Sequence, residues 1–195
     1  MRADPLSTEL LKMAYEQGIF PMGLENGEIG WFRSDPRAIF ELNNFHTSRS
    51  LQKCIRNCGW RISFDECFED VMRGCLRPDG NWITSELIDL YCEAHHEGWA
   101  HSCEVWDDKQ LIGGVYGLAL GSCFCAESMF HLRTDASKVA LWALVTRCRD
   151  LGFTLFDAQV MNPHLASLGA IEITLSDYFQ RLENALAQTT DWSRG

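Results

Sequence analysis

Residues 101–130 constrain the fold most strongly, because their pattern predicts three consecutive β-strands. Two apolar stretches, HSCEVW (101–106) and QLIGGVYGLAL (110–120), are joined by the turn residues Asp107, Asp108 and Lys109. A short polar turn between two such stretches is typical of a β-hairpin. The stretch SCFCAESMF (122–130) continues as a third strand. We therefore expect an antiparallel unit of three strands in the middle of the chain.

Helical patterns flank these strands on both sides. The longest, TDASKVALWALVTRCRDLG (134–152), is amphipathic and ends at Gly152, and the strand TLFDAQV (154–160) follows it at once. Further helices are predicted over 7–18, 47–58, 65–75, 85–98, 163–168 and 175–188, with a short strand over 60–64. This order predicts the α+β class, with helices packed on a mixed, mainly antiparallel sheet, and is compatible with the N-acyltransferase (GNAT-like) fold. We expect a small N-terminal region over 1–40, rich in Gly and Pro, and a main domain over 41–195.

The composition excludes several classes of protein. Apolar residues make up 46% of the chain, which argues against disorder, and no stretch approaches the roughly 18 apolar residues of a membrane span. The first residues, MRADPLSTELLK, lack the apolar stretch of a secretory signal, so we expect a cytoplasmic protein with reduced cysteines. Neither the cysteine spacing nor His95 and His96 matches a metal-site motif, so no metal is expected. A net charge of −10 argues against broad nonspecific binding of nucleic acid, so any contact with RNA has to be local.

The strand TLFDAQV carries the clearest candidates for catalysis. Because side chains alternate along a strand, Leu155, Asp157 and Gln159 are expected on one face and Phe156 on the other. The strand lies between two helices, which predicts a central, buried position. A buried carboxylate without partners costs several kcal/mol, so a functional role is favoured over local capping of the backbone.

A second carboxylate lies at the end of the preceding strand. Glu127 is expected on the same side as Cys123 and Cys125. Taken alone, it is typical of an edge residue that enters solvent. Paired with Asp157, it would form an acidic pocket suited to a cationic group of a substrate.

A small basic stripe is the main candidate for a contact with RNA. Arg49, Lys53 and Arg56 share one face of the helix predicted over 47–58. Such a stripe is usually a solvated surface, but in an acidic chain it is also a candidate phosphate contact. Aromatic residues such as Trp82 are typical of a core, with stacking on a base as the functional alternative.

Eight segments of the chain together form one recognisable pattern. They are GIFPMG (18–23), SDPRAI (34–39), HTSRSL (46–51), WITSELIDLY (82–91), GWAHSCEVW (98–106), LIGGVYGLALGSCFCAESMF (111–130), ASKVAL (136–141) and FDAQVMNPHLASLGA (156–170). In this order and with similar spacing, over roughly residues 8–180, they resemble one known family, the bacterial leucyl/phenylalanyl-tRNA–protein transferases.

The resemblance implies a transferase that takes leucine or phenylalanine, and in some cases methionine, from aminoacyl-tRNA. The amino acid is joined to a protein whose N-terminal residue is Arg or Lys, which creates a degradation signal, and the reaction uses neither a metal nor coenzyme A. The catalytic residues implied are Asp157, Gln159 and Glu127. The substrate-binding residues implied are Trp82, Met22, Tyr15, Tyr91, Phe124 and Met129, and the tRNA-binding residues implied are Arg49, Lys53 and Arg56.

The chemistry of these residues fits that reaction. The aminoacyl ester is already activated, so the enzyme has mainly to position an amine and assist proton transfer. We expect Asp157 to orient Gln159, whose carbonyl oxygen accepts a hydrogen bond from the attacking amine. Glu127, together with Asp157, is expected to receive the basic acceptor residue.

Several departures from the family pattern leave alternatives open. The family usually carries a longer glycine-rich N-terminal region, its WSPDPR pattern reads WFRSDPR, and Asn57 replaces a further cation. One alternative is an N-acyltransferase with another activated donor, although RTDASK (133–138) stands in place of a coenzyme A pyrophosphate loop. The other is a noncatalytic protein that binds N-terminal Arg or Lys. We expect a monomer.

Overall fold

The computed structural model describes residues 6–78, 80 and 82–194. In this part of the chain seven strands form one sheet, in the order β4-β5-β6-β7-β8-β3-β9, and two form a separate hairpin, β1-β2. The helices are α1 (Thr8–Glu16), α2 (Arg49–Asn57), α3 (Phe68–Gly74), α4 (Ser85–His96), α5 (Ala136–Asp150), α6 (Pro163–Ser167) and α7 (Leu175–Leu186). The strands are β1 (Phe20–Gly23), β2 (Ile29–Phe32), β3 (Arg37–Phe40), β4 (Arg61–Phe64), β5 (Ala100–Asp107), β6 (Gln110–Leu120), β7 (Cys123–His131), β8 (Leu155–Gln159) and β9 (Ile171–Ile173).

The three strands predicted over residues 101–130 form the middle of the large sheet. β5, β6 and β7 pair in antiparallel fashion, and β8 then lies parallel to β7, with Asp157 opposite Cys125. All other pairs in the sheet are antiparallel. The α+β class with a mixed, mainly antiparallel sheet flanked by helices is therefore confirmed.

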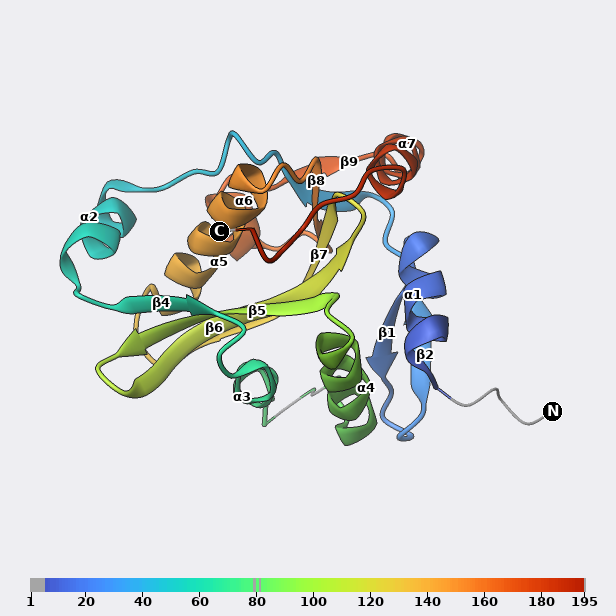
Figure 1. Cartoon of the computed structure of the whole chain (residues 1–195), viewed down its shortest axis with the longest axis horizontal. Helices are drawn as coiled ribbons and strands as arrows, with labels where there is room; N and C mark the ends of the chain where they lie inside the picture. Colours follow the sequence, from blue (N-terminus) through green and yellow to red (C-terminus); the bar gives the residue numbers. More distant parts are fainter. Residues whose placement is uncertain (1–5, 79, 81, 195) are drawn as a thin grey trace.

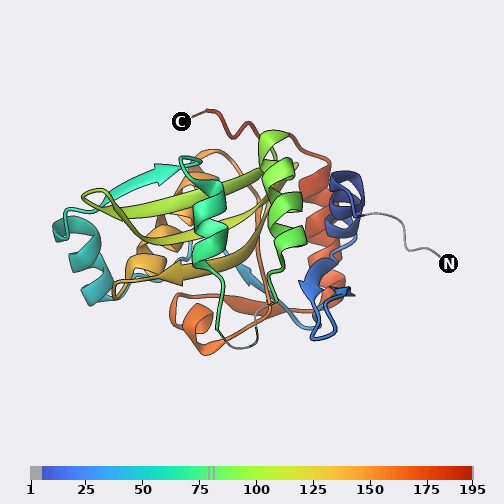
Figure 2. The ribbon, with the colours of Figure 1, turned by 90° about the horizontal axis from the view of Figure 1, so that it is seen from below.

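Helices cover both faces of the sheet, and each face has its own apolar cluster. Figure 1 shows α5 above the central strands and α3 and α4 below them. The α5 side holds Phe124 and Phe156, whereas the α3 and α4 side holds Cys123, Cys125 and Leu155. Seen from below, α3 and α4 cross the strands, and α1 and α7 lie together at one end of the sheet (Figure 2).

Four short strands, β1, β2, β3 and β9, were not predicted individually from the sequence. The first three lie in the Gly- and Pro-rich stretch 18–40, whose composition predicts a loop-like region with only short extended pieces. Of these, β3 is inserted into the large sheet between β8 and β9. All four of its residues are buried, including the charged Arg37. Strands this short show no periodic pattern, and the pairing partners of β3 and β9 lie far away in the sequence.

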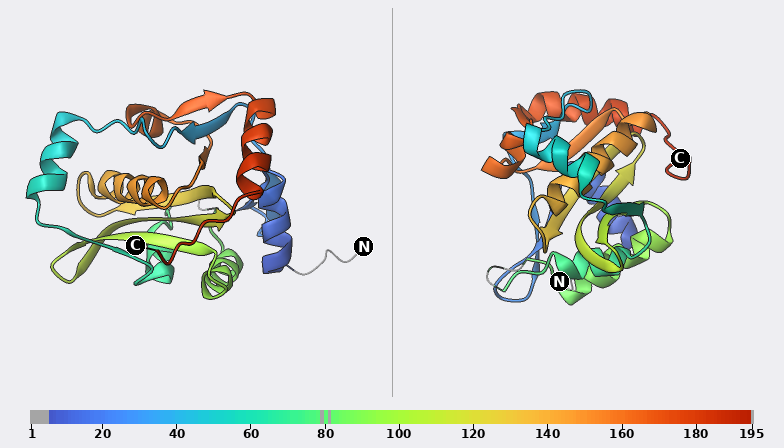
Figure 3. Two further views of the ribbon diagram at one scale, coloured as in Figure 1. Left: turned by 45° about the horizontal axis from the view of Figure 1, so that its top comes forward. Right: turned by 90° about the vertical axis from the view of Figure 1, so that its left-hand side faces the viewer.

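The segment after α7 returns across the molecule toward α5 (Figure 3). Its Trp192 ring stacks on His101, with 4.2 Å between ring centroids, and on Phe124, with 5.5 Å. These ring contacts fasten the C-terminal segment to the α5 side of the sheet. None of the helices in the described ranges combines the length and the apolar character needed to cross a membrane.

Candidate active site

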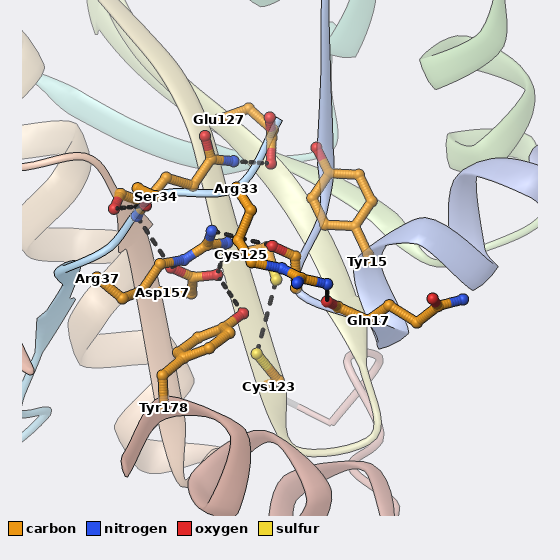
Figure 4. Close-up of polar contacts among 12 residues, drawn as sticks. Tyr15, Gln17, Arg33, Ser34, Arg37, Cys123, Cys125, Glu127, Asp157 and Tyr178 are labelled. Atoms are coloured by element: carbon orange, nitrogen blue, oxygen red, sulfur yellow. Dashed lines mark hydrogen bonds and ion pairs between the residues drawn. The ribbon is translucent and has the colours of Figure 1, made fainter. Parts of the chain in front are cut away.

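Asp157 lies at the centre of a buried polar cluster on β8. The predicted alternation is observed, because Leu155 packs on the α4 side of the sheet and Phe156 on the α5 side. Asp157 shares the face of Leu155, and its side chain is fully buried. The cluster around it is drawn in Figure 4.

All the acceptor positions of Asp157 are used by neighbouring donors. Its Oδ1 accepts from Arg37 Nε and from the Gln159 backbone N–H, both at 2.9 Å. Its Oδ2 accepts from Arg37 Nη2 at 2.6 Å and from the Tyr178 hydroxyl at 2.8 Å. An ionised carboxylate has about four lone-pair sites. Asp157 therefore has no free site for a substrate.

Arg37 compensates the buried charge of Asp157. The two form a bidentate pair in which both side chains are fully buried. Burial alone would lower the pKa of Arg37, but the charge of Asp157 and its hydrogen bonds raise that pKa above its usual value. The guanidinium also donates to the Gly18 carbonyl at 3.1 Å and lies over the Tyr178 ring. Such a pair holds both residues in one geometry.

Gln159 is fixed through its backbone, and its amide is directed at Glu127. Its N–H bonds to Asp157, and its carbonyl accepts from the Ser34 hydroxyl at 2.6 Å. The backbone adopts a left-handed conformation, with φ of 61°, which is uncommon for a residue other than glycine and is often found at functional sites. The side-chain Nε2 donates to Glu127 Oε1 at 2.7 Å.

Glu127 lies above a pair of buried tyrosines. The Tyr91 hydroxyl donates to Glu127 Oε2 at 3.4 Å, and the Tyr15 and Tyr91 hydroxyls lie 2.5 Å apart. Figure 4 shows the Tyr15 hydroxyl turned toward Glu127. Burial raises the pKa of the Glu127 carboxyl to about 7, although hydrogen bonds from Tyr15 and Gln159 act in the opposite direction. Burial raises the pKa of Tyr15 and Tyr91 well above the usual value, so both hydroxyls stay protonated.

A cavity of about 420 Å³ opens beside Glu127 and Gln159. Its wall is largely apolar and includes three of the residues predicted to bind substrate, Met22, Trp82 and Met129. The other lining residues are Phe20, Phe40, Arg77, Val115, Ala126, Ser128, Leu141, Ala158, Val160, Asn162 and Leu165. An apolar cavity with a few convergent polar groups is the usual form of a small-molecule site.

Phe124 is not part of this cavity, contrary to the prediction. It follows the alternation of β7, so its ring faces away from Cys125 and Glu127. There it is fully buried and stacks on Phe156 with 5.5 Å between ring centroids. Its position is that of a core residue on the α5 side.

Tyr15 and Tyr91 also lie outside the lining of the cavity. Both are buried in the core beneath Glu127, and both were expected as apolar contacts for a substrate side chain. Their hydroxyls instead form the hydrogen-bonded pair described above. Their polar groups, rather than their rings, connect them to the site.

The expected acidic pocket of Glu127 and Asp157 is reduced to one carboxylate. Only Glu127 lines the cavity, whereas Asp157 is enclosed by its four donors. Sequence reasoning also missed Arg37, Tyr178 and Ser34. A signal was present, since a buried Asp157 needs a cation, and Arg37 is a cation directly before the apolar residues of 38–40.

The basic stripe is present as predicted on the exposed face of α2. Arg49, Lys53 and Arg56 are all exposed. Figure 3 shows α2 at the opposite end of the molecule from α1. The described residues therefore place the stripe on the surface and away from the core of the site.

One further cluster combines residue types that bind metals. Asp65, His95 and His101 hold ligand-type atoms within 4.8 Å of one another. The carboxylate of Asp65 already accepts from the Ser102 backbone N–H at 2.8 Å, from His101 Nδ1 at 2.9 Å and from Trp192 Nε1 at 2.7 Å. These hydrogen bonds connect β4, β5 and the C-terminal segment, which gives the cluster a structural role.

Comparison with known proteins identifies the family. The model of the leucyl/phenylalanyl-tRNA protein transferase family matches residues 39–183, and the model of its N-terminal domain matches residues 4–35. Curated relatives named leucyl/phenylalanyl-tRNA–protein transferase include one from Cereibacter sphaeroides, 51% identical, with 95% of this chain and 88% of the relative covered. Another, from Shewanella baltica, is 47% identical, with 96% and 82% covered.

Solved structures with a similar arrangement are more distant. L-PGS from Bacillus licheniformis is 12% identical with a TM-score of 0.46, and the match covers 90% of this chain and 61% of that one. A GCN5-related N-acetyltransferase-like protein from Streptococcus suis is 15% identical with a TM-score of 0.37, covering 86% and 64%. The family models and the relatives at about half identity are decisive. The chain belongs to the leucyl/phenylalanyl-tRNA–protein transferase family.

Proposed function

We propose that this protein transfers leucine or phenylalanine from aminoacyl-tRNA to the N-terminal Arg or Lys of an acceptor protein, so that the acceptor gains a degradation signal. The names of the curated relatives support the aminoacyl transfer. One geometric observation carries the assignment of the site, namely that Gln159 and Glu127 are hydrogen-bonded to each other on the wall of an apolar cavity.

Gln159 positions the attacking amine. Its Nε2 is engaged by Glu127, so its carbonyl oxygen is the end of the amide that is available to accept a hydrogen bond from the α-amine. Its backbone is fixed by Asp157 and Ser34, which sets the direction of the amide. Positioning of this kind accounts for a large part of the rate when the donor is already activated. Asp157 thus acts through Gln159 and is a positioning residue.

The apolar part of the cavity receives the leucyl or phenylalanyl side chain. Met129 and Leu165 belong to this wall, while Trp82 and Met22 are suited to the terminal base of the tRNA. Ionised Glu127 attracts the cationic N-terminus of the acceptor. We propose that the protein acts as a monomer in the cytoplasm, where charged tRNA is present.

Replacing Gln159 with alanine is expected to reduce transfer about 100-fold, because a misplaced reactant typically loses that much rate. The assay measures labelled Leu, Phe or Met moving from tRNA to a peptide that begins with Arg. The matched control is Gln110→Ala, an exposed glutamine at the far end of β6, which should transfer at the wild-type rate. Absence of transfer by the wild-type protein, with the Arg peptide still bound, would identify a noncatalytic reader of N-terminal residues instead.

We propose that the stripe on α2 contacts the phosphates of the tRNA. Changing Arg49, Lys53 and Arg56 together to glutamine should raise the Kd for tRNA and reduce the slope of log K against log salt by about one for each phosphate that is no longer neutralised. The control changes three exposed cations elsewhere to glutamine, so the net charge falls equally: Arg61, Arg73 and Arg149. An equal drop in affinity in both triple variants would show that only overall charge matters.

A further inference from the structure

Two carboxylates lie at the centre of the site, but only one of them can meet a substrate amine. Asp157 is enclosed by Arg37, Tyr178 and the Gln159 backbone, and it does not line the cavity. Glu127 does line the cavity, and its Oε1 contacts the same Gln159 amide that positions the amine. An amine bound to the Gln159 carbonyl oxygen therefore lies next to Glu127.

The other carboxylate oxygen of Glu127, Oε2, is held by two buried tyrosines. Tyr91 from α4 donates to Oε2, and Tyr15 from α1 lies within hydrogen-bond distance of Tyr91. Both tyrosines are fully buried, so their positions are set by core packing. The carboxylate is thus fixed between a substrate-facing amide and two buried hydroxyls.

We propose that Glu127 takes one proton from the α-ammonium group of the acceptor protein, and that Tyr15 and Tyr91 are positioning residues that hold its carboxylate for this step. The proposal rests on the proposed transfer reaction and adds the group that activates the nucleophile. General bases must lie within hydrogen-bond reach of the proton that they remove. Among the described lining residues, Glu127 is the carboxylate that satisfies this condition.

The step balances without any further reactant. The α-ammonium gives one of its three protons to Glu127, and the neutral nitrogen forms a bond to the carbonyl carbon of the aminoacyl ester. The ester C–O bond then breaks, and the leaving ribose oxygen takes the second proton from the nitrogen. The third proton remains on the new amide, and Glu127 returns its proton to water.

The carboxyl group of Glu127 and the α-amino group of the acceptor have similar pKa values. The pKa of Glu127 is about 7 because of burial, and that of an α-amino group is about 7.7–8.0. Proton transfer between groups so close in pKa requires little free energy. The titratable and charged groups that face Glu127 or line the cavity with it are Tyr15, Tyr91, Tyr116, Cys125, Arg37, Asp157 and Arg77.

The test is the pH profile of kcat/KM for a peptide that begins with Arg, at saturating phenylalanyl-tRNA. In the wild type, activity should fall below pH 7, where Glu127 is protonated, and fall again above the pKa of the peptide amine, where the ammonium is lost. Glu127→Gln should reduce kcat/KM at least about 100-fold. Its remaining activity should follow the fraction of free amine, so the midpoint of the acidic fall should move from about 7 to the pKa of the peptide amine, about 7.7–8.0, and the alkaline fall should be lost.

Tyrosine-to-phenylalanine variants test the positioning role. Tyr91→Phe and Tyr15→Phe remove hydroxyls that favour the ionised form of Glu127, so the pKa of Glu127 should rise. The acidic limb of the profile, which is the fall in activity near pH 7, should therefore move to higher pH. The matched control is Tyr116→Phe, since Tyr116 is equally buried, packs edge-on against Tyr91 and has no hydrogen-bond partner for its hydroxyl among the described residues. This control should keep the wild-type profile.

The outcomes separate the two proposals. A wild-type protein that transfers no amino acid would overturn the proposed function itself. A wild type that transfers, together with a folded Glu127→Gln variant that keeps the wild-type rate or the wild-type pH profile, with its acidic midpoint near 7 and its alkaline fall, would overturn the role of Glu127 while leaving the transfer reaction in place. An unchanged limb in Tyr91→Phe and Tyr15→Phe would overturn the role of the tyrosines.

Discussion

Replacing Arg37 with methionine is expected to lower the free energy of unfolding by about 3–5 kcal/mol, because the change leaves an uncompensated charge in the core. Arg37 and Asp157 are both fully buried, and Arg37 supplies two of the four donors to the carboxylate. Methionine keeps much of the apolar packing against the Phe20 and Tyr178 rings but supplies no hydrogen bond. Urea denaturation followed by circular dichroism measures the change.

A second variant distinguishes the effect of the ion pair from the effect of packing. The double change Arg37→Met and Asp157→Asn removes the buried charge, while the Asn side-chain oxygen can still accept from Tyr178 or from the Gln159 N–H. It should be more stable than Arg37→Met alone. The comparison at the surface is Arg181→Met, whose pair with Glu41 has side chains 41% and 39% exposed and should contribute no more than about 1 kcal/mol. A double variant as unstable as the single one would show that packing, not charge, is the cause.

Local patterns were sufficient to predict much of the fold. The strands over 101–130 pair with their neighbours in the chain. Ser7, the first residue of the helix predicted over 7–18, caps α1 by accepting a hydrogen bond from the Leu10 N–H at 3.2 Å. β3 and β9 were missed because they are short and pair with distant partners. The division of the chain at residue 40 stays a prediction, and β3, on its N-terminal side, is a strand of the large sheet.

At the candidate site, too, local sequence patterns predicted which residues come together but not their partners from distant parts of the chain. Alternation on β8 and on the end of β7 correctly brought Asp157, Gln159 and Glu127 to one face. Sequence patterns do not reveal which donors occupy a carboxylate, so the enclosure of Asp157 by Arg37 and Tyr178 became visible only in three dimensions. The same reasoning explains Tyr15 and Tyr91, since a tyrosine in an apolar pattern predicts a buried ring but not the partner of its hydroxyl.

The C-terminal segment gives the second large expected effect. Replacing Trp192 with alanine should lower the free energy of unfolding by about 3 kcal/mol, near the lower end of the range for removing a packed aromatic side chain, because Trp192 is only partly buried. Its ring stacks on His101 and Phe124, and its indole N–H donates to Asp65 at 2.7 Å. Its removal would release the segment that follows α7.

Intermediate variants separate the contributions of Trp192. Trp192→Phe keeps the stacking but removes the hydrogen bond to the carboxylate of Asp65, so it should be destabilised by about 1.5–3 kcal/mol, the usual contribution of a bond to a charged group, and remain more stable than Trp192→Ala. Trp31→Ala is the control, since Trp31 is exposed on β2 and its replacement should cost less than about 1 kcal/mol. Thermal unfolding followed by tryptophan fluorescence or circular dichroism measures all three variants. Because Trp192 does not line the cavity beside Glu127 and Gln159, transfer at low temperature should stay within about twofold of wild type. An unchanged unfolding midpoint in Trp192→Ala would show that the C-terminal segment adds nothing to stability.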